Sequence, residues 1–359
     1  MSIESTIIDL IEGRLKNVFL QAVLYVLSLF YQNILFFRHF LYDIGFLSSY
    51  TAKCPVVSVG NIVAGGTGKT PFVRKLTEEL SEGCGSVAIL SRGYRSQAEH
   101  GFVLASSGKG PLVSVAICGD EPYWLASKVN ASIWVGKNRA WNARQASLTG
   151  AKILILEDGF QHRKMKRDLD IVLLDATNLF GYGYFLPRGY LRDSPKRLKE
   201  ADFVVVTRLQ EGFSEEEILE AIRPFTKAPI IGFAASYLLS PSVKGKKVGA
   251  FCGIGKPDLF YQALSLEGVE LVKTLSLSDH EAPSLKLLSS FALECKNLGA
   301  DYLVCTEKDE VKLSEISPLA LPVEVLKMDL SCIWNQNIWK EMIRSIKNKT
   351  KKNNRGAAL

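Results

Sequence analysis

GNIVAGGTGKTP, from Gly60 to Pro71, is the most informative stretch of the chain. It follows the apolar run Pro55–Val59 and precedes Phe72–Leu80, where the pattern is helical. The residues therefore predict a buried strand, a glycine-rich turn and a helix, in that order. This order is typical of a loop that wraps the phosphates of a nucleoside triphosphate.

The chemistry of the turn supports this interpretation. Its glycines let successive backbone N–H groups point at phosphate oxygens, and the helix adds its positive N-terminal end. The strict pattern G-x-x-x-x-G-K-[ST] requires Gly where this chain has Val63, so a glycine-rich turn without a ligand is the alternative. Lys69 is expected at the β- and γ-phosphates and the Thr70 hydroxyl at Mg²⁺. The residues predicted to bind the nucleotide are Gly65, Gly66, Thr67, Gly68, Lys69 and Thr70.

Composition places the chain among folded intracellular proteins. Its 359 residues are 47% hydrophobic, and its seven cysteines are scattered without a C-x-x-C pair. These features favour a packed core in a reducing compartment, without a disulfide framework or a zinc site. The net charge of +7 comes mostly from the C-terminal tail, which has no acid beyond Glu341, so the body is nearly neutral. We expect a disordered basic tail over 346–359, with weak attraction to anionic lipid as the functional alternative.

The N-terminal segment, residues 1–50, is unusually apolar and aromatic. No charged residue lies between Lys16 and Arg38, although Gln32 and Asn33 interrupt the apolar run. The apolar run is short for a membrane span, and the aromatic residues of the segment suit a headgroup boundary. We therefore expect a membrane-associated helix that lies at the interface, with a true span and an ordinary core helix as alternatives.

The rest of the chain alternates strand and helix patterns. This rhythm predicts an α/β fold: a parallel sheet sandwiched by helices around the phosphate loop, then a second, smaller α/β unit. We place the nucleotide-binding domain at 51–235 and the smaller domain at 236–345, with Ala234–Lys247 as the connection. The expected strands are Pro55–Val59, Ser86–Leu90, Ile133–Val135, Lys152–Leu156, Asp170–Leu174, Asp202–Thr207, Pro229–Phe233, Val248–Cys252, Glu270–Leu275, Asp301–Cys305 and Pro322–Leu326.

Two acidic motifs follow apolar runs. EDGFQH ends the run Ile153–Leu156, and its Glu157 and Asp158 are expected near Thr70, where they would bind Mg²⁺. A plain strand end before a glycine turn is the alternative. GDEP follows Leu112–Ile117, so its Asp120 lies either at a ligand-binding strand end or as the cap of the next helix.

Other motifs are weaker by themselves. Arg92 of SRGY follows a strand, and Arg192 lies in LPRGYLRD, within the irregular stretch Leu179–Pro195. Such arginines grip phosphates or form surface ion pairs. SDH, with Asp279 and His280, precedes a helix, and TEKD ends the next strand.

The motifs of this chain, in their order, resemble those of the tetraacyldisaccharide 4'-kinase family. They are PVVSVGNIVAGGTGKTP, SRGY, GDEP, EDGFQH, LPRGYLRD, SDH and TEKD. The resemblance runs from about residue 37 to about residue 312, and the family has the same variant of the phosphate loop. It implies an enzyme on the cytoplasmic face of the inner membrane. ATP would be the phosphate donor, and the acceptor would be the 4'-hydroxyl of a tetraacylated glucosamine disaccharide 1-phosphate in lipid A synthesis.

The resemblance also implies roles for single residues. Asp120 corresponds to the catalytic acid/base and is paired with His280. Glu157 and Asp158 correspond to the metal-site acids, but the family usually has Asp where this chain has Glu157. Arg92, Arg139 and Arg192 are the candidates for binding the acceptor's 1-phosphate or the nucleotide.

Two other function classes remain open on the residues alone. A soluble P-loop ATPase or GTPase switch would share the phosphate loop, although TEKD is only a distant echo of the guanine-binding Asn-Lys-x-Asp motif. A nucleic-acid-binding protein would use the basic tail, but the near-neutral body and the lack of an aromatic-basic groove pattern argue against it. We therefore expect no nucleic-acid partner, and nothing in the sequence indicates an obligate protein partner.

Overall fold

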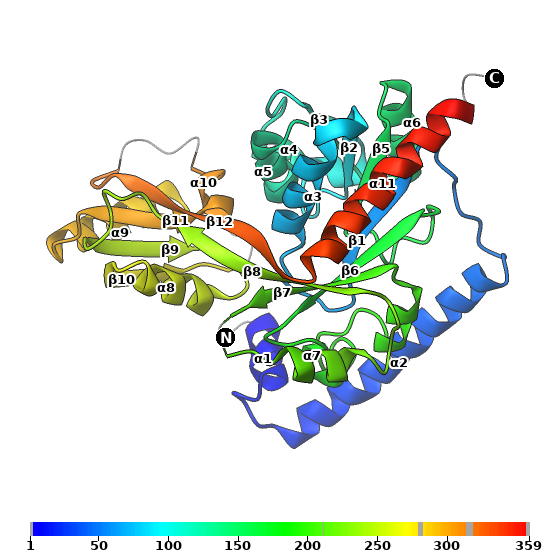
Figure 1. The fold of residues 1–359 in the computed structure, drawn as a ribbon. Helices are drawn as coiled ribbons and strands as arrows, with labels where there is room; N and C mark the ends of the chain where they lie inside the picture. The colour runs from blue at the N-terminus through cyan, green and yellow to red at the C-terminus, as the bar shows by residue number, and fades with distance from the viewer. Residues whose placement is uncertain (1–2, 211, 279–282, 314–318, 357–359) are drawn as a thin grey trace.

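The structure is a computed structural model that describes residues 3–210, 212–278, 283–313 and 319–356. Within these residues, two α/β units lie side by side and share one 12-stranded sheet, in the order β10-β9-β11-β12-β8-β7-β6-β1-β5-β2-β4-β3 (Figure 1). The strands are β1 (Val56–Asn61), β2 (Val87–Ser91), β3 (Val103–Ser107), β4 (Ser132–Val135), β5 (Ile153–Glu157), β6 (Leu169–Asp175), β7 (Phe203–Leu209), β8 (Ile230–Leu238), β9 (Lys247–Cys252), β10 (Glu270–Ser276), β11 (Tyr302–Thr306) and β12 (Val323–Trp334).

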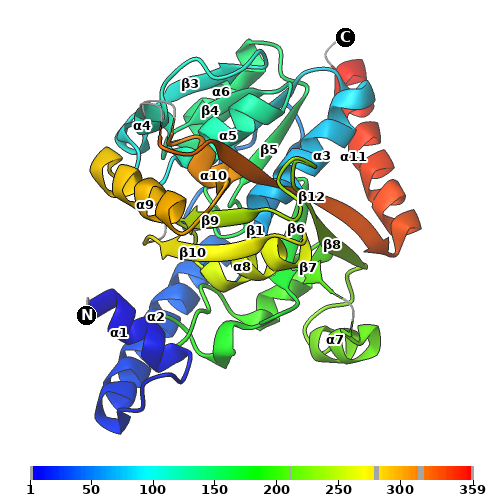
Figure 2. The same ribbon diagram turned by 90° about the vertical axis from the view of Figure 1, so that its left-hand side faces the viewer.

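The helices flank this sheet on both faces, which confirms the predicted α/β class (Figure 2). The α-helices are α1 (Ile3–Ile11), α2 (Val18–Asp43), α3 (Lys69–Cys84), α4 (Val115–Cys118), α5 (Asp120–Lys128), α6 (Arg139–Leu148), α7 (Glu215–Ile222), α8 (Pro257–Leu266), α9 (Leu285–Asn297), α10 (Glu307–Glu310) and α11 (Gln336–Gly356). Three 3₁₀ helices are η1 (Gln97–His100), η2 (Gly181–Gly183) and η3 (Pro195–Glu200).

The larger unit is built around β1, whose neighbours β5 and β6 are both parallel to it. All residues of β1 are buried. Helices α3, α5 and α11 cover one face of this part of the sheet, and α6 and α7 pack on the other. Strands buried on both faces lose the polar alternation of half-exposed strands, which explains the continuous apolar runs in the sequence.

The smaller unit continues the same sheet. Strand β12 pairs through Leu303↔Val323 with the parallel strand β11, and further along through Leu330↔Ala235 with the antiparallel strand β8. Helix α8 packs on one face of this part and α9 on the other. The two predicted units are thus joined through β8 and β12, and β8 extends to Leu238, into the segment that we had expected to be a simple connection.

The last helix returns to the larger unit. Trp339 of α11 packs against Phe72 of α3 and Phe233 of β8, with ring centroids 5.8 and 5.2 Å apart. Met342 and Ile346 lie in the same core. The helix runs to Gly356, so the expectation of disorder from residue 346 is wrong for 346–356; an apolar stripe at helical spacing offsets the charged composition.

The GDEP motif follows a helix, not a strand. The apolar run Leu112–Ile117 ends in the short helix α4, and Gly119 is the N-cap of α5, so Asp120 is the first residue of that helix and not its cap. The additional strand β3 pairs antiparallel with β4 at the edge of the sheet.

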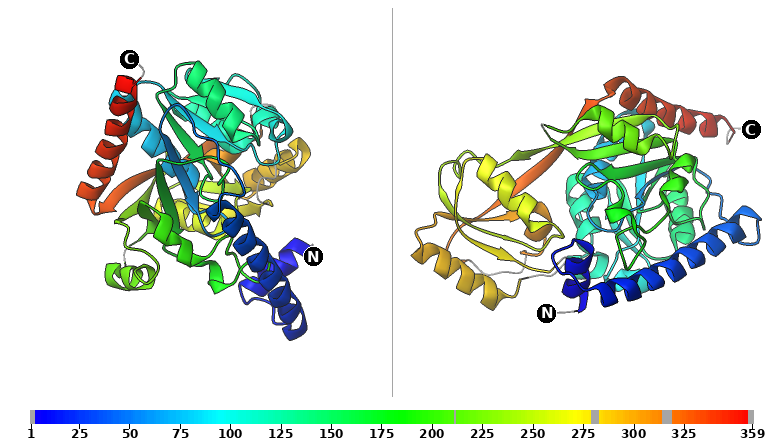
Figure 3. Two further views of the ribbon diagram at one scale, coloured as in Figure 1. Left: turned by 90° about the vertical axis from the view of Figure 1, so that its right-hand side faces the viewer. Right: turned by 90° about the horizontal axis from the view of Figure 1, so that it is seen from below.

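Helix α2 is continuous through Gln32 and Asn33 and lies along the larger unit, most plainly in the view from below (Figure 3). It is long and apolar enough to cross a membrane by length and composition. Only 11% of its most apolar 18-residue window is buried, which rules out the alternative of an ordinary core helix.

Candidate active site

The phosphate loop connects β1 to α3, as predicted. Gly65 and Gly68 have φ of 99° and 78°, a region of backbone space that glycine enters without strain. Asn61 donates one hydrogen bond to the Val63 carbonyl and one to Thr67 Oγ1, at 2.6 and 2.9 Å. A side chain at the end of the strand therefore holds the curl of the loop.

The EDGFQH turn is bound to the same strand. Gly159 N donates to the Val59 carbonyl at 3.1 Å, and Gln161 Nε2 donates to the Asn61 carbonyl at 2.6 Å. A Cβ on Gly60 would lie 2.5 Å from Phe160 Cβ, so only glycine permits this approach. Residues far apart in sequence are thereby fixed beside the phosphate loop.

Asp158 receives two cations. Arg192 donates to its two carboxylate oxygens at 3.1 and 3.0 Å, and Lys69 Nζ lies 3.6 Å from Oδ1. Burial opposes ionisation here, but Lys69 and Arg192 outweigh it and hold the pKa of Asp158 well below its usual range. Asp158 also has φ of 51°, a strained conformation of the kind that clusters at functional sites.

Glu157 differs strongly from its neighbour. It ends β5 with 3% of its surface exposed, and Ser91 donates a hydrogen bond to its Oε2 at 3.0 Å. Burial first, and then the charges of Glu121 and Asp158, raise the pKa of Glu157 to about 7. These three acids form a concentration of negative charge that suits a divalent cation with oxygen ligands.

Two of the candidate arginines differ in exposure. Arg139 at the start of α6 is buried, and burial lowers the pKa of its guanidinium while Glu157 and Asp158 raise it. Arg92 is half-exposed and forms an ion pair with Glu99 at 2.9 Å.

His162, at the end of EDGFQH, has a pKa lowered to about 3 by burial and by nearby cations, Arg139 first among them, so its ring is neutral at physiological pH.

The irregular LPRGYLRD loop pairs with the entry to the phosphate loop. Ala64 N donates to the Tyr190 carbonyl at 2.7 Å, and Arg192 N donates to the Ile62 carbonyl at 2.8 Å. Backbone bonds therefore place the Arg192 side chain over Asp158. The sequence indicated a functional loop here but not its partner.

The GDEP acids face cations from the smaller unit. Lys312 Nζ lies 3.3 Å from Asp120 Oδ2, and Lys308 Nζ lies 2.6 Å from Glu121 Oε1. Sequence reasoning missed both lysines, although TEKD, which contains Lys308, was the available signal. His280, the expected partner of Asp120, lies outside the described residues, so the structure does not place it.

The last residue of TEKD, Asp309, is not available to a ligand. Asp309 is completely buried, accepts a hydrogen bond from Gly253 N at 3.0 Å and another from Thr306 Oγ1 at 2.7 Å. A guanine-binding aspartate must instead face an open pocket, so this motif braces the smaller unit.

A second contact joins the units on the other side of the phosphate loop. Lys256, which follows β9, reaches Asp175 Oδ2 at 3.0 Å, and Arg208 binds the same oxygen. The neighbouring Thr207 hydroxyl donates to the Thr67 carbonyl at 2.9 Å. Sequence reasoning missed this cluster because its members belong to three separate segments.

The curled loop, its lysine, the acids that end the neighbouring strand and a clamping arginine define a P-loop phosphotransferase. The chain belongs to the tetraacyldisaccharide-1-P 4'-kinase family, whose model matches residues 20–347. It is 36% identical to the tetraacyldisaccharide 4'-kinase of Halothermothrix orenii over 341 residues, which cover 87% of this chain and 88% of that protein. The enzyme of the same name from Syntrophus aciditrophicus is 35% identical over 330 residues, covering 86% and 88%.

A solved structure agrees with this assignment. The crystal structure of LpxK from Aquifex aeolicus in complex with ATP superposes with a TM-score of 0.73 at 30% identity, covering 91% of this chain and 99% of that one. The family match does not favour the alternative of a soluble ATPase or GTPase switch.

Proposed function

We propose that this chain transfers the γ-phosphate of ATP to the 4'-hydroxyl of a tetraacylated glucosamine disaccharide 1-phosphate. The observation that supports it most directly is the contact of Lys69 and Arg192 with Asp158 beside the phosphate loop, in a member of the 4'-kinase family. Phosphoryl transfer needs alignment and charge neutralisation more than covalent chemistry, and this arrangement supplies both.

Each part of the site has a role in this proposal. The backbone N–H groups of Gly65–Lys69 hold the phosphates, and Lys69 neutralises their charge. Mg²⁺ would be held by Thr70, Glu157 and Asp158 and would neutralise charge on the phosphates, which fits the concentrated acids around Glu157. Since Mg²⁺ usually takes only one or two carboxylates together with the substrate's own phosphates, the site needs no larger cluster of protein ligands.

Asp120 is the proposed general base. At the start of α5, with Lys312 beside it, its carboxylate would accept the proton of the 4'-hydroxyl as that oxygen attacks. His280, by the family resemblance, would act with it. Because Lys308 and Lys312 come from the smaller unit, this half of the site depends on the contact between the two units.

The arginines divide between the two substrates. Arg139 and Arg192 interact electrostatically with Glu157 and Asp158, so we assign them to the transferring phosphate. Arg92, half-exposed beside the site, is the candidate for the acceptor's 1-phosphate.

A transfer assay tests the function. ATP-Mg and a disaccharide 1-phosphate lipid in detergent micelles should give a phosphorylated lipid, with much slower ATP hydrolysis when the lipid is omitted. Equal nucleotide hydrolysis with and without the lipid, and no lipid product, would leave an ATPase and contradict the proposal.

We also propose that α2 lies on the surface of the inner membrane, on its cytoplasmic side. Contacts with the larger unit run from Tyr25, whose ring meets Tyr184, to Asp43, which pairs with Arg163. The helix from Tyr25 to Asp43 spans about 27 Å, so most of α2 is engaged with protein along one side, which favours a position along the membrane surface over a span. Its other side presents large exposed apolar residues, among them Phe19, Phe30 and Phe37.

Flotation with anionic phospholipid vesicles tests this placement. Deleting the residues before Lys53 should release the protein, and the variant with Phe30→Ser and Phe37→Ser should do so without disturbing the docked side of α2. Full retention of both would assign membrane binding to another surface.

A further inference from the structure

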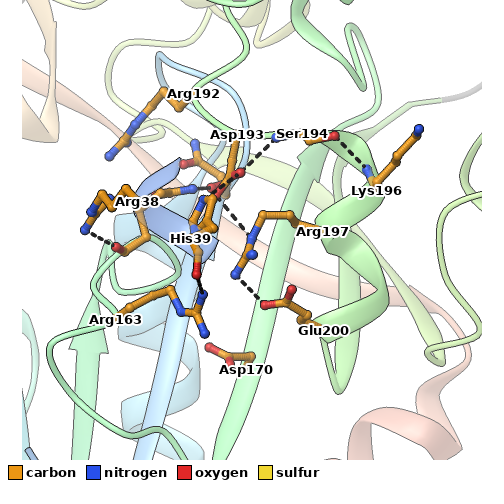
Figure 4. A network of polar contacts seen from close by, with 12 residues as sticks. Arg38, His39, Arg163, Asp170, Arg192, Asp193, Ser194, Lys196, Arg197 and Glu200 are labelled. Carbon is orange, nitrogen blue, oxygen red and sulfur yellow. Dashed lines mark hydrogen bonds and ion pairs between the residues drawn. The ribbon is translucent and has the colours of Figure 1, made fainter. Parts of the chain in front are cut away.

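The docked side of α2 contacts the active site itself. Tyr31 OH donates a hydrogen bond to the Arg192 carbonyl at 3.2 Å. His39 Nε2 lies 3.3 Å from Asp193 Oδ1, and Figure 4 shows His39 and Arg38 pointing from the helix toward these loops. The partners, Arg192 and Asp193, are adjacent residues, and the first of them clamps Asp158.

A second contact reaches the other side of the same carboxylate. Arg38 Nη2 donates to the Gln161 carbonyl at 2.9 Å, and Gln161 in turn holds the end of β1 through the Asn61 carbonyl. Helix α2 therefore contacts both chain segments that determine where Asp158 lies. An anchor that served only to hold the protein at a membrane would need neither contact.

Burial sets the His39–Asp193 contact apart from a surface attachment. The side chains of His39 and Asp193 are 9% and 2% exposed. The Asp193 carboxylate also accepts a hydrogen bond from Ser194 N at 2.9 Å and forms an ion pair with Arg197 Nε at 3.6 Å. Polar partners buried in this way cost desolvation and contribute little net stability compared with apolar packing. What they provide is a single register of one element on another.

Register matters because residue 192 connects three parts of the site. Its backbone N binds the phosphate-loop residue Ile62, its side chain binds Asp158, and its carbonyl receives Tyr31. A shift of α2 along its axis would be passed to the Arg192 backbone directly through the ring of Tyr31. A misplacement of about 1 Å at a phosphoryl-transfer site costs on the order of 10²-fold in rate.

We propose that Tyr31 and His39 are positioning residues. Through them, the position of α2 on the larger unit determines the geometry of the Arg192–Asp158 pair. This inference rests on the proposed kinase function. It assigns to α2 a part in the transfer step that is separate from membrane attachment.

The experiment compares His39→Leu, His39→Gln and Tyr31→Phe with the control Asn33→Ala. Asn33 is exposed on the same helix and donates to the Leu29 carbonyl within that helix. For each variant, kcat and the KM values for ATP and lipid are measured in micelles, together with vesicle flotation and the melting temperature.

His39→Leu should lower kcat about tenfold, with the KM for ATP within about twofold of the wild type and flotation retained. His39→Gln, which keeps a donor at similar reach, should restore most of the rate. Tyr31→Phe, which loses one hydrogen bond and keeps its ring, should lower kcat about threefold. Asn33→Ala should match the wild type.

A double-mutant cycle with Arg192→Lys identifies the route of action. If His39 acts through Arg192, His39→Leu should lower kcat by less than about twofold when it is added to Arg192→Lys. An equal cost in both backgrounds would overturn the inference, as would an unchanged kcat in His39→Leu. A rate loss matched by lost ATP affinity, lost flotation or a lower melting temperature would also overturn it, because the contact would then be merely structural. The proposed function is judged separately, on lipid phosphorylation by the wild-type protein.

Discussion

The two sides of the active site are held together by different forces. On the nucleotide side, backbone hydrogen bonds tie the phosphate loop to EDGFQH and LPRGYLRD, all within the larger unit. On the side of Asp120, ion pairs of lysines join the two units: Lys308 with Glu121, Lys312 with Asp120 and Lys128 with Glu307. The comparison teaches that the phosphate donor binds to a preformed loop, whereas the base lies where the two units meet, beside the partly exposed Lys308–Glu121 pair that salt can weaken.

Asp120→Ala and Asp120→Asn are the strongest test of this division. With the proposed base removed and the phosphate loop untouched, turnover should fall on the order of 10³-fold while ATP affinity stays within about twofold. Steady-state kinetics and isothermal titration with ATP measure the two effects. Parallel loss of both would mean that Asp120 is a structural residue or a metal ligand.

Lys69→Ala tests the preformed side. Removing the cation that faces Asp158 should weaken ATP binding and lower the transfer rate by about 10²-fold. Binding is measured by displacement of a fluorescent nucleotide. Unaffected nucleotide affinity would discredit the assignment of the loop.

Lys308→Ala tests the contact between the units. The pair with Glu121 is partly exposed, so its loss should cost about fivefold in kcat/KM for the lipid and little in ATP affinity. Raising the salt concentration should reduce the difference from the wild type. Lys286→Ala, the same change at an exposed position of α9, is the matched control and should be silent; equal losses in both would point to overall charge.

Glu157 sharpens the comparison because acids from both sides act on it. Its folded-state pKa of about 7 lies above its ordinary value of 4.5. The folded state therefore binds more protons between these values, and without nucleotide its stability falls as pH rises through about 7. Glu157→Gln should remove this fall and stabilise the protein by about 1 kcal/mol at pH 8, with no difference below about pH 4.5. Urea unfolding at several pH values measures it; identical profiles would contradict the raised pKa.

The parts that the sequence predicted well are local. The phosphate loop and EDGFQH each consist of a strand, a turn and chemistry-bearing residues within about a dozen positions, so residue spacing alone indicates their geometry. The family resemblance supplied the pairing of Asp120 with His280, which spacing alone does not indicate. The resemblance was also the basis for expecting a lipid acceptor.

The parts that it missed depend on contacts between distant segments. Lys308 of the smaller unit forms an ion pair with Glu121 of the larger unit, and Trp339 of α11 packs against Phe72 of α3. In α11 the lysines dominate the composition and hide Ile338, Met342 and Ile346, whose spacing of four residues marks a buried stripe. Only tertiary packing decides such cases, since composition alone describes a solvated tail.

The return of α11 to the larger unit has a consequence for synthesis of the protein. Phe72 of the phosphate-loop helix and Phe233 pack on each other, and both also pack against Trp339, which leaves the ribosome long after they do. A nascent chain that stops before Gln336 exposes this apolar surface, a feature by which chaperones and proteases recognise unfinished proteins. Packing of the phosphate-loop helix therefore depends on a segment that is synthesised long after it.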